Sequence, residues 1–491
     1  MAVVKQVEQL KNYLDKIARK KYALTVLSWE MKVVAPKASL NDLINVMNDI
    51  EKECFSLATS EEYYRLLNEA LQASELKDLN IEEQKYIKKL YDDFCKIKNV
   101  PLDFYAEYTK EINIAQTVWV EAKKANDYNI FKNTLEKLIT LTKKFYAYMY
   151  PDAESLYDKM LDTYENGITS KDIDPVFDEL KKEIRPIIAS LPAADHTPLI
   201  VYDKPTLLKI GYFLLDYIGY DNSKAVLDFY PHGFTNKVSR DDVRIAFDER
   251  RTIYDTVCTI IHEGGHGIFE QHTGAHLEQF PGYEVTNMGL HESQSRFYEN
   301  ILGRNIHFWT PIYDEVAKML NLKESVEQFV KRLNTAMPSL IRTEADEFTY
   351  CMHIIVRYEI ERMIFNDDIN LNELPQIWND KMKEYLGVTV DSDAHGILQD
   401  VHWSQGSFGY FPDYLLGSIF DGMLLEHINS ELGNIDNILQ KGDIKKITKY
   451  LIDNIHIHGN TYNVFELSQK LCGKTLSAKP IVEYFKQKYE V

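Results

Sequence analysis

Two histidines four residues apart occupy the segment Thr259-Ile260-Ile261-His262-Glu263-Gly264-Gly265-His266-Gly267-Ile268-Phe269, which has the pattern HExxH. Residues four apart lie on the same face of an α-helix, so both imidazoles can reach one metal ion. Glu263 follows His262 by roughly 100° around the helix, which places its carboxylate beside the ion instead of on it. The segment therefore predicts a zinc helix near residues 255–271 that supplies two ligands and a general base, as in metallopeptidases.

The residues around the two histidines indicate a buried site. Residues 259–261 make the approach to the motif apolar, and ionisable groups are costly to bury unless they bind something. Gly264, Gly265 and Gly267 each lower the helix propensity by about 1 kcal/mol relative to alanine. We therefore expect another part of the molecule to pack closely against the backbone of this helix.

The composition excludes several classes of partner. The net charge of -19 comes from 75 acidic and 56 basic residues, which favours solubility and argues against nucleic acid or an anionic membrane surface as a partner. Five scattered cysteines contain no CxxC pair, which predicts no disulfide framework and fits a reducing compartment. No stretch approaches the ~18 apolar residues of a membrane-spanning helix, and residues 1–21 lack the apolar core of a signal peptide. We therefore expect a cytoplasmic, non-membrane protein.

Most of the chain has apolar residues at helical spacing, and proline and glycine are few, at 15 and 21 of 491 residues. We predict a mainly α protein, with a single large domain over residues 1–491 in which two helical lobes surround a deep active-site cleft. No repeat, low-complexity tract or linker marks a domain boundary. Two short β-rich runs, at residues 196–202 and 243–247, predict a small sheet beside the cleft.

A catalytic zinc site uses three protein ligands and a water. Glu270 would continue the row of the two histidines instead of closing a tetrahedron, so the third ligand should come from another helix. Residues 288–302 predict that helix, on which Arg296 can brace Glu292 from one turn away. Glu292 is the first candidate from chemistry alone, and the other acids and histidines after the motif stay open: Glu270, His272, His276, Glu278, Glu284, His291 and Glu299.

The HExxH segment and the later string His291-Glu292-Ser293-Gln294-Ser295-Arg296 together resemble the carboxypeptidase Taq family of zinc metallocarboxypeptidases, whose pattern is HExxH followed by HES(x)SR. The resemblance covers most of the chain, from Trp29-Glu30 to the C-terminal region. It includes Asp242-Val243-Arg244, the Ile-Arg-Thr-Glu-Ala-Asp-Glu string at residues 341–347, and residues 396–403, which match the family's GxxQDxHW string in full.

The resemblance implies that Glu292 is the third zinc ligand, that Glu263 is the general base, and that the chain forms a homodimer. One zinc ion per chain is expected, and cobalt or manganese could substitute for it. The chain departs from the family pattern at Gly233, where proline is usual, and at Ala246, where threonine is usual. These departures concern substrate positioning and leave the implied ligands and base in place.

In the expected reaction, Glu263 deprotonates a zinc-bound water that attacks the scissile carbonyl, and then carries the proton to the leaving amine. The oxyanion needs a further donor, for which Tyr410, Tyr414 and His402 are candidates. Resemblance to the broader group of helical zinc peptidases, in which a tyrosine near a Gly-Tyr-rich loop has this role, favours Tyr414. His232 either orients the substrate or has a packing role.

A carboxypeptidase must also bind the free C-terminal carboxylate of its peptide substrate, for which a bidentate guanidinium is best suited. Arg342 is the first candidate, followed by Arg244 and Arg357. The alternative is a buried ion pair with Glu344 or Asp346.

Three functions compete at this stage. The first is a zinc carboxypeptidase that releases C-terminal residues one at a time, and the second is an endo-acting zinc oligopeptidase of related helical fold. These two differ mainly in whether the cleft is closed beyond the scissile bond. The third is a helical scaffold with a structural metal, against which the intact Glu263 argues, because a structural site requires no general base.

Overall fold

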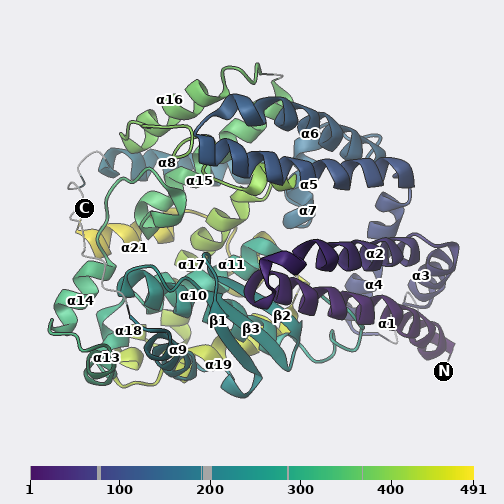
Figure 1. The fold of residues 1–491 in the computed structure, drawn as a ribbon. Coiled ribbons are helices and arrows are strands. Elements are labelled where there is room, and N and C mark those ends of the chain that lie inside the picture. The colour runs from purple at the N-terminus through teal and green to yellow at the C-terminus, as the bar shows by residue number, and fades with distance from the viewer. Residues whose placement is uncertain are drawn as a thin grey trace.

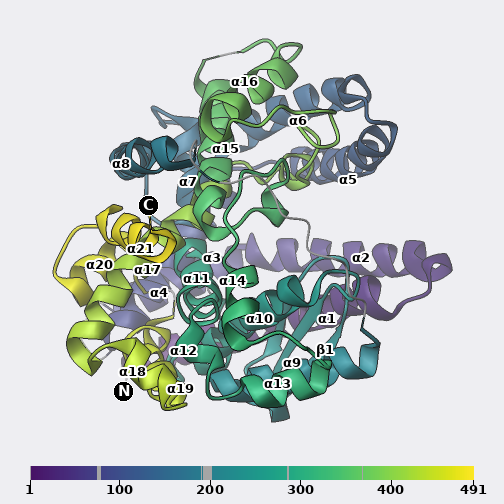
Figure 2. The ribbon, with the colours of Figure 1, turned by 90° about the vertical axis from the view of Figure 1, so that its left-hand side faces the viewer.

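The structure is a computed structural model that describes residues 2–74, 79–188, 191, 202–284, 287–367, 369–459 and 461–490. As predicted, these residues are mainly helical and contain a small three-stranded sheet. The helices form an upper and a lower group (Figures 1 and 2). One hydrophobic cluster contains buried residues from Val7 to Phe485. The single domain over residues 1–491 stays a prediction.

The upper group contains α5 (Leu102–Ala125), α6 (Tyr128–Met149), α8 (Ser170–Ile188), α15 (Glu347–Asn366) and α16 (Leu374–Leu386). The lower group contains α1 (Ala2–Trp29), α2 (Leu40–Ala58), α3 (Glu61–Ser74), α4 (Ile81–Ile97), α9 (Lys204–Ile218), α10 (Ile253–His272), α12 (Ile306–Trp309), α13 (Tyr313–Leu320), α14 (Val326–Leu333), α18 (Ile435–Gln440) and α19 (Ile444–Asn454). Between the groups lie α7 (Leu156–Tyr164), α11 (Met288–Arg296), α17 (Phe411–Leu432) and α21 (Lys479–Tyr489). The C-terminal part also contains α20 (Val464–Cys472).

The predicted zinc helix is α10, which begins after Thr252. The Thr252 hydroxyl caps the helix by accepting a hydrogen bond from the backbone N–H of Asp255 at 3.2 Å. A Cβ at Gly265 would lie 2.7 Å from the carbonyl oxygen of Gln294 in α11, so only glycine permits this approach of the two backbones. The expected close packing against the zinc helix is therefore confirmed, and it brings α11 next to the two histidines.

The small sheet lies beside α10. Its central strand is β3 (Asp242–Phe247), with β1 (Ala225–Phe229) parallel to it and β2 (Phe234–Ser239) antiparallel. Val243, Ile245 and Phe247, which share one face of β3, are fully buried, and Ala246 on the other face is buried as well. The predicted strand at residues 243–247 is confirmed, whereas residues 196–201 of the other β-rich run lie outside the described residues.

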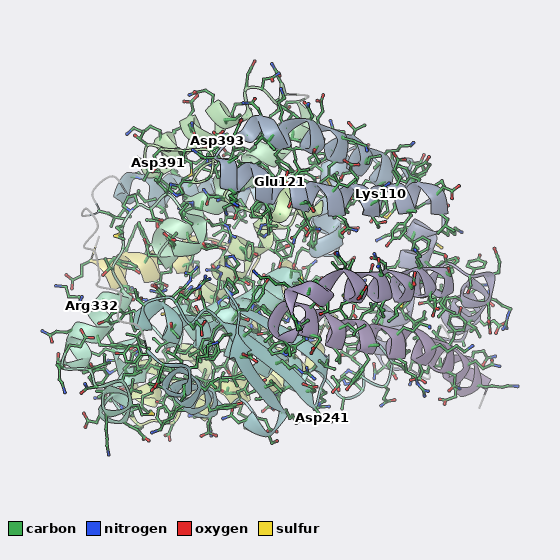
Figure 3. All side chains as sticks on the ribbon, in the orientation of Figure 1. Lys110, Glu121, Asp241, Arg332, Asp391 and Asp393 are labelled. Carbon is green, nitrogen blue, oxygen red and sulfur yellow. The ribbon has the colours of Figure 1, made fainter. Side chains whose placement is uncertain are left out.

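Charged side chains are exposed on the outer helices, as Lys110 and Glu121 of α5 and Arg332 of α14 illustrate (Figure 3). Within the described ranges, every helix is too short or too polar to cross a lipid bilayer. All five cysteines are free thiols. The absence of a disulfide framework was predicted from their scattered spacing.

Candidate metal centre and active site

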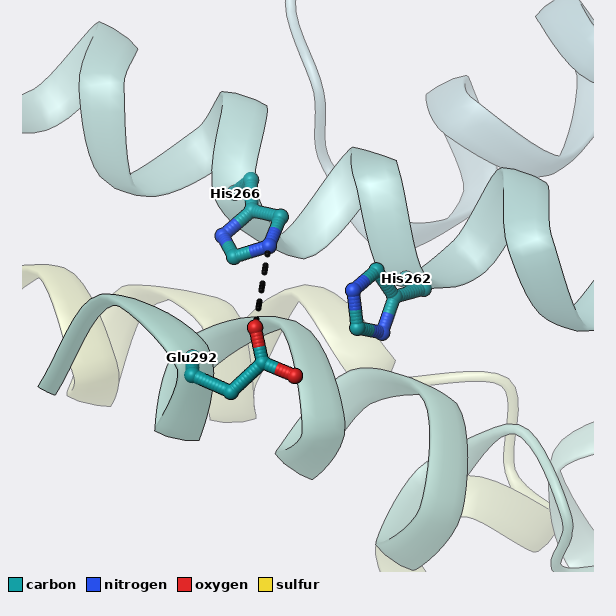
Figure 4. A group of neighbouring side chains, drawn as sticks. All are labelled: His262, His266 and Glu292. Carbon is teal, nitrogen blue, oxygen red and sulfur yellow. Dashed lines mark ion pairs between the residues drawn. The ribbon is translucent and has the colours of Figure 1, made fainter. Parts of the chain in front are cut away.

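Three side chains converge between α10 and α11. The ligand atoms of His262, His266 and Glu292 all lie within 4.8 Å of one another. Nε2 of His266 lies 3.5 Å from Oε2 of Glu292, and His262 is one helical turn away on the same face of α10 (Figure 4). The structure thus brings the two histidines of the motif together with the acid that chemistry and resemblance had selected from the second helix.

His262 is held by a carboxylate behind it. Its Nδ1 lies 2.9 Å from Oε2 of Glu299, and the other oxygen of Glu299 accepts a hydrogen bond from Arg304 at 3.0 Å. Glu299 lies in a π-helical turn, Phe297–Leu302, that continues α11; such turns re-aim side chains and are common at functional sites. A carboxylate on Nδ1 assigns the proton to that nitrogen and leaves Nε2 as an electron-pair donor.

His266 and Glu292 are also fixed by their surroundings. Nε of Arg296 donates to Oε1 of Glu292 at 2.6 Å, which leaves Oε2 facing His266. Nδ1 of His266 is buried and has no hydrogen-bond partner among the described residues. Its ring packs on that of His291, with the centroids 4.4 Å apart, and Nε2 of His291 lies 3.0 Å from Oε1 of Glu270. Arg296 therefore orients Glu292, and packing against His291 orients His266.

The donor set fits a metal ion. Two imidazole nitrogens and one carboxylate oxygen are the protein ligands of many catalytic zinc sites, which keep a further position for water or substrate. The atoms of Glu292 and His262 that face away from the cluster are engaged by Arg296 and Glu299. Only His266 and Glu292 pair with each other within the cluster, and three buried donors that converge on one point are costly unless a cation joins them.

Glu263 is buried beside the cluster. The hydroxyl of Thr235 in β2 donates to its Oε2 at 2.6 Å. Burial raises the pKa of Glu263 above its usual value, and the Thr235 hydrogen bond opposes this effect. A Cβ at Gly233 would lie 2.9 Å from Oε1, so the glycine leaves room for the second oxygen of the carboxylate. Gly233 and Thr235 therefore position both carboxylate oxygens of the predicted base.

One cavity of about 680 Å³ joins the cluster to the upper group of helices. His262, Glu263 and Glu292 line it from the lower side, and Trp119 and Lys123 of α5 line it from the upper side. Four of the predicted substrate-binding or catalytic residues also line the cavity: His232, Arg342, His402 and Tyr414. The predicted cleft therefore contains most of the candidate site.

His402 and Tyr414 form a pair in the cavity wall, with Nε2 of His402 3.2 Å from the Tyr414 hydroxyl. Burial and the charge of Arg342 lower the pKa of His402 to about 3, so the imidazole is neutral. Burial raises the pKa of Tyr414 above its usual value, which keeps its hydroxyl protonated. If His402 carries its proton on Nε2, it donates to Tyr414 and leaves the tyrosine proton available to another acceptor.

Arg342 pairs with Asp400, and not with Glu344 or Asp346 as the alternative had expected. Its Nε donates to Oδ1 of Asp400 at 2.9 Å, and its Nη1 donates to the Tyr350 hydroxyl at 2.9 Å. Within the described part of the chain these bonds leave Nη2 of Arg342 without a hydrogen bond.

The other oxygen of Asp400 accepts a hydrogen bond from Nε of Arg357 at 2.6 Å. The carboxylate of Asp400 therefore pairs with two guanidiniums, so Arg342, Arg357 and Asp400 together carry a net charge of plus one. Arg357 is fully buried, whereas Arg342 lines the cavity. The uncompensated positive charge is accordingly open to the cavity at Arg342.

A family model described as carboxypeptidase Taq (M32) metallopeptidase matches residues 9–489. The chain belongs to this family. Carboxypeptidase 1 of Bacillus subtilis is 35% identical over 97% of this chain and 96% of its own length. A solved structure of the Pyrococcus furiosus carboxypeptidase is 30% identical, covers 99% of both chains and superposes with a TM-score of 0.92. Metallocarboxypeptidase 1 of Trypanosoma cruzi has 27% identity and a TM-score of 0.91 over 99% of this chain and 100% of that chain.

As a member of this family, the chain is a metallocarboxypeptidase. Two of its predicted substrate-binding or catalytic residues, Arg244 and Tyr410, lie outside the residues that line the cavity. Arg244 of β3 forms a bidentate pair with Asp242, at 2.8 and 2.7 Å, and its guanidinium lies 5.7 Å from the Trp29 ring. Tyr410 packs against Tyr414, with the ring centroids 5.2 Å apart. Arg244 is therefore paired within the sheet, and Tyr410 supports Tyr414.

Three contributors to this metallocarboxypeptidase site were missed at the sequence level. Thr235 orients Glu263, Glu299 orients His262, and Asp400 compensates Arg342. Asp400 lies within the GxxQDxHW string, and Glu299 had been considered only as a ligand. Thr235 carries no sequence signal, because its role depends on how β2 packs against α10.

Proposed function

We propose that the chain is a zinc-dependent carboxypeptidase that releases C-terminal amino acids from peptides, with His262, His266 and Glu292 as ligands and Glu263 as general base. The observation that carries this proposal is one cavity shared by a three-donor cluster, a buried carboxylate beside it and a guanidinium with a spare donor group. The name carboxypeptidase 1 of the Bacillus subtilis relative supports the same reaction. Cobalt or manganese could replace zinc.

A zinc ion held by these three side chains would polarise the scissile carbonyl and acidify the attacking water. Glu263 accepts a proton from that water and passes it to the leaving amine. The Thr235 hydroxyl keeps Oε2 of Glu263 in one orientation.

Tyr414 donates a hydrogen bond to the carbonyl oxygen as negative charge develops on it. Neutral His402 orients the tyrosine hydroxyl through the 3.2 Å contact. The guanidinium of Arg342 lies 5.1 Å from the centre of the Tyr414 ring, so the oxyanion donor and the nearest cation belong to one rigid wall. A donor that is already oriented needs no reorganisation during the reaction.

Arg342 binds the terminal carboxylate of the substrate. Its free Nη2 and the excess positive charge over Asp400 favour an anion at this place. A peptide bound there ends at the cavity wall, so one residue extends past the scissile bond. His232 also lines the cavity, and burial together with Arg251 lowers its pKa, so it is neutral and can contact the released residue.

We also propose that the enzyme acts in the cytoplasm as a homodimer, without nucleic acid or membrane partners. Five free thiols support a reducing compartment. The net charge of -19 argues against nucleic acid and anionic membranes as partners. The homodimer rests on the family resemblance alone, and light scattering of the purified chain tests it.

Metal removal tests the proposal. Dialysis against a chelator should abolish peptide hydrolysis, and one equivalent of zinc per chain should restore it. Glu292→Ala should lose zinc, whereas Glu344→Ala, which removes another carboxylate from the same cavity, should retain it. Hydrolysis that persists after complete metal removal would contradict the proposal.

A further inference from the structure

A buried carboxylate joins α7 to the helix that carries Glu292. Glu165 follows the last residue of α7 and is 1% exposed. Its Oε2 accepts the backbone N–H of Gly289 in α11 at 2.9 Å, and its Oε1 accepts that of Val464 in α20 at 2.8 Å. The first turns of two helices, each with unpaired N–H groups and a positive dipole end, therefore converge on one carboxylate.

The contact is built for this carboxylate. A Cβ at Gly289 would lie 2.9 Å from Oε2 of Glu165, so a larger residue would press on the acid. The next residue, Asn166, continues the junction, because its carbonyl accepts a hydrogen bond from Asn463 at 2.7 Å. Its N–H donates to the side chain of Asn287 at 3.3 Å. The end of α7 thus fixes the starts of α11 and α20 in both position and direction.

The start of α11 determines where its metal-facing side lies. Glu292 is three residues after Gly289, about one turn along the helix. On its sides α11 is already confined, because its backbone approaches Gly265 of α10 and Gly417 of α17 to the point where a Cβ on either would lie 2.7 Å away. Sideways movement is therefore blocked, and the bond to Glu165 resists sliding along the helix axis together with the bond from Ser293 to Asp421 of α17.

The middle of α7 contacts the opposite wall of the cavity. A Cβ at Gly409 would lie 2.8 Å from the backbone of Met160. Glu361 of α15 accepts hydrogen bonds from the Tyr157 hydroxyl of α7 at 3.0 Å, from the N–H of Gly409 at 2.9 Å and from the indole of Trp403 at 2.8 Å. Gly409 and Trp403 belong to the segment that carries His402 and Tyr414.

We propose that α7 is a spacer that sets the separation between the metal-binding helix and the segment of residues 402–409, which carries His402. In this arrangement Glu165 is the positioning residue for Glu292, and Glu361 is the positioning residue for His402, which contacts Tyr414 of α17. The inference rests on the proposed function for the roles of these groups. In Figures 1 and 2, α7 lies below α15 and above α11. Burial raises the pKa of both acids to about 7, a cost that simple packing with apolar residues would avoid.

The test measures zinc affinity of the apoenzyme by competition with a chromophoric chelator, without substrate. Glu165→Gln should weaken zinc binding about tenfold, the scale expected when a group that orients a metal ligand is lost. It should lower kcat and leave KM unchanged, because Arg342 is untouched. Glu361→Gln should lower kcat while zinc affinity stays at the wild-type value, since only the opposite wall moves.

The matched control is Glu179→Gln. Glu179 of α8 caps another helix in the same way, since it accepts the N–H of Ala478 at 3.0 Å and the Ser477 hydroxyl at 3.2 Å at the start of α21. This variant should keep both zinc affinity and kcat. If Glu165→Gln does not fold, Gly289→Ala replaces it and should weaken zinc binding by a similar factor.

Unchanged zinc affinity in folded Glu165→Gln or Gly289→Ala would overturn the inference, as would an equal loss in Glu179→Gln. The proposed function fails separately: zinc-loaded wild-type enzyme that does not hydrolyse peptides would refute it, while the zinc measurements would still report on Glu165.

Discussion

The two faces of the active-site cavity are built in different ways. The metal face takes its proposed ligands from residues 262–292, on two helices that touch through the backbone at Gly265. The facing wall takes Arg342, Asp400 and Tyr414 from separate elements and joins them through buried charges. We infer that helix geometry fixes the metal face, whereas charge compensation fixes the wall. Changes on the first should alter chemistry, and changes to the charged residues of the second should alter substrate binding.

The largest effect is expected at the general base on the metal face. Glu263→Gln keeps the shape of the side chain but cannot accept the proton, so kcat should fall by about 10³-fold or more. Metal analysis should show zinc at the wild-type level. Appreciable turnover in the zinc-loaded variant would remove Glu263 from the mechanism.

On the facing wall, Tyr414→Phe removes the proposed oxyanion donor and should lower kcat by about 10²-fold with little change in KM. Steady-state kinetics on a short peptide measures both constants. Tyr410→Phe is the matched control, because Tyr410 contacts the Tyr414 ring but is not among the residues that line the cavity. It should have a much smaller effect on kcat. Equal losses in the two variants would contradict the assignment of Tyr414.

The proposed carboxylate-binding role of Arg342 gives an effect of similar size that is specific to peptides with a free C-terminus. Arg342→Lys retains the charge and loses the planar donor set, so kcat/KM for peptides with a free C-terminus should fall about 10²-fold, equivalent to about 3 kcal/mol. Arg244→Lys should change it by less than about threefold, because Arg244 is paired with Asp242 away from the cavity. A larger loss in Arg244→Lys than in Arg342→Lys would reverse the two assignments.

Thr235 tests how far the strand segment supports the metal face. Thr235→Val is nearly isosteric and removes the hydrogen bond to Glu263, which should lower kcat about tenfold. Zinc content and KM should stay the same. A wild-type kcat in Thr235→Val would show that the carboxylate is oriented without this hydroxyl.

The smallest effect concerns stability and pH. Burial raises the pKa of Glu361 to about 7, whereas an unfolded glutamate titrates near pH 4.3. The folded chain binds the extra proton between these values, so Glu361 lowers stability as the pH rises from about 4 to 7. Urea unfolding of Glu361→Gln and wild type should show the variant gaining in relative stability between pH 5 and pH 7. A difference in unfolding free energy between the two proteins that does not change with pH would contradict the raised pKa of Glu361.

The two faces also differ in how much could be predicted from the sequence. His262, His266 and Glu263 follow from helix spacing, and Glu292 follows from the need for a second helix together with the family resemblance. The choice between Arg342 and Arg244 could have been sharpened, because Asp242 and Arg244 are two apart in a strand and so share one face. The pairing of Arg342 with Asp400 crosses 58 residues, and the contact of Thr235 with Glu263 depends on packing between a strand and a helix; neither has a local pattern.

The fold was predictable at the level of class. Helical periodicity gave the mainly α structure, and the run at residues 243–247 gave the central strand. Helix α7 shows the limit, because the buried bonds of Tyr157 and of Glu165 just after the helix connect it to residues more than a hundred positions away.

The most direct test of the central claim compares one unstructured peptide with a free C-terminus and the same peptide with an amidated C-terminus, followed by mass spectrometry with zinc-loaded enzyme. We predict stepwise loss of residues from the free end and little cleavage of the amide, because Arg342 would meet no carboxylate. Internal cleavage of both peptides at similar rates would contradict the account and would identify an endo-acting oligopeptidase instead.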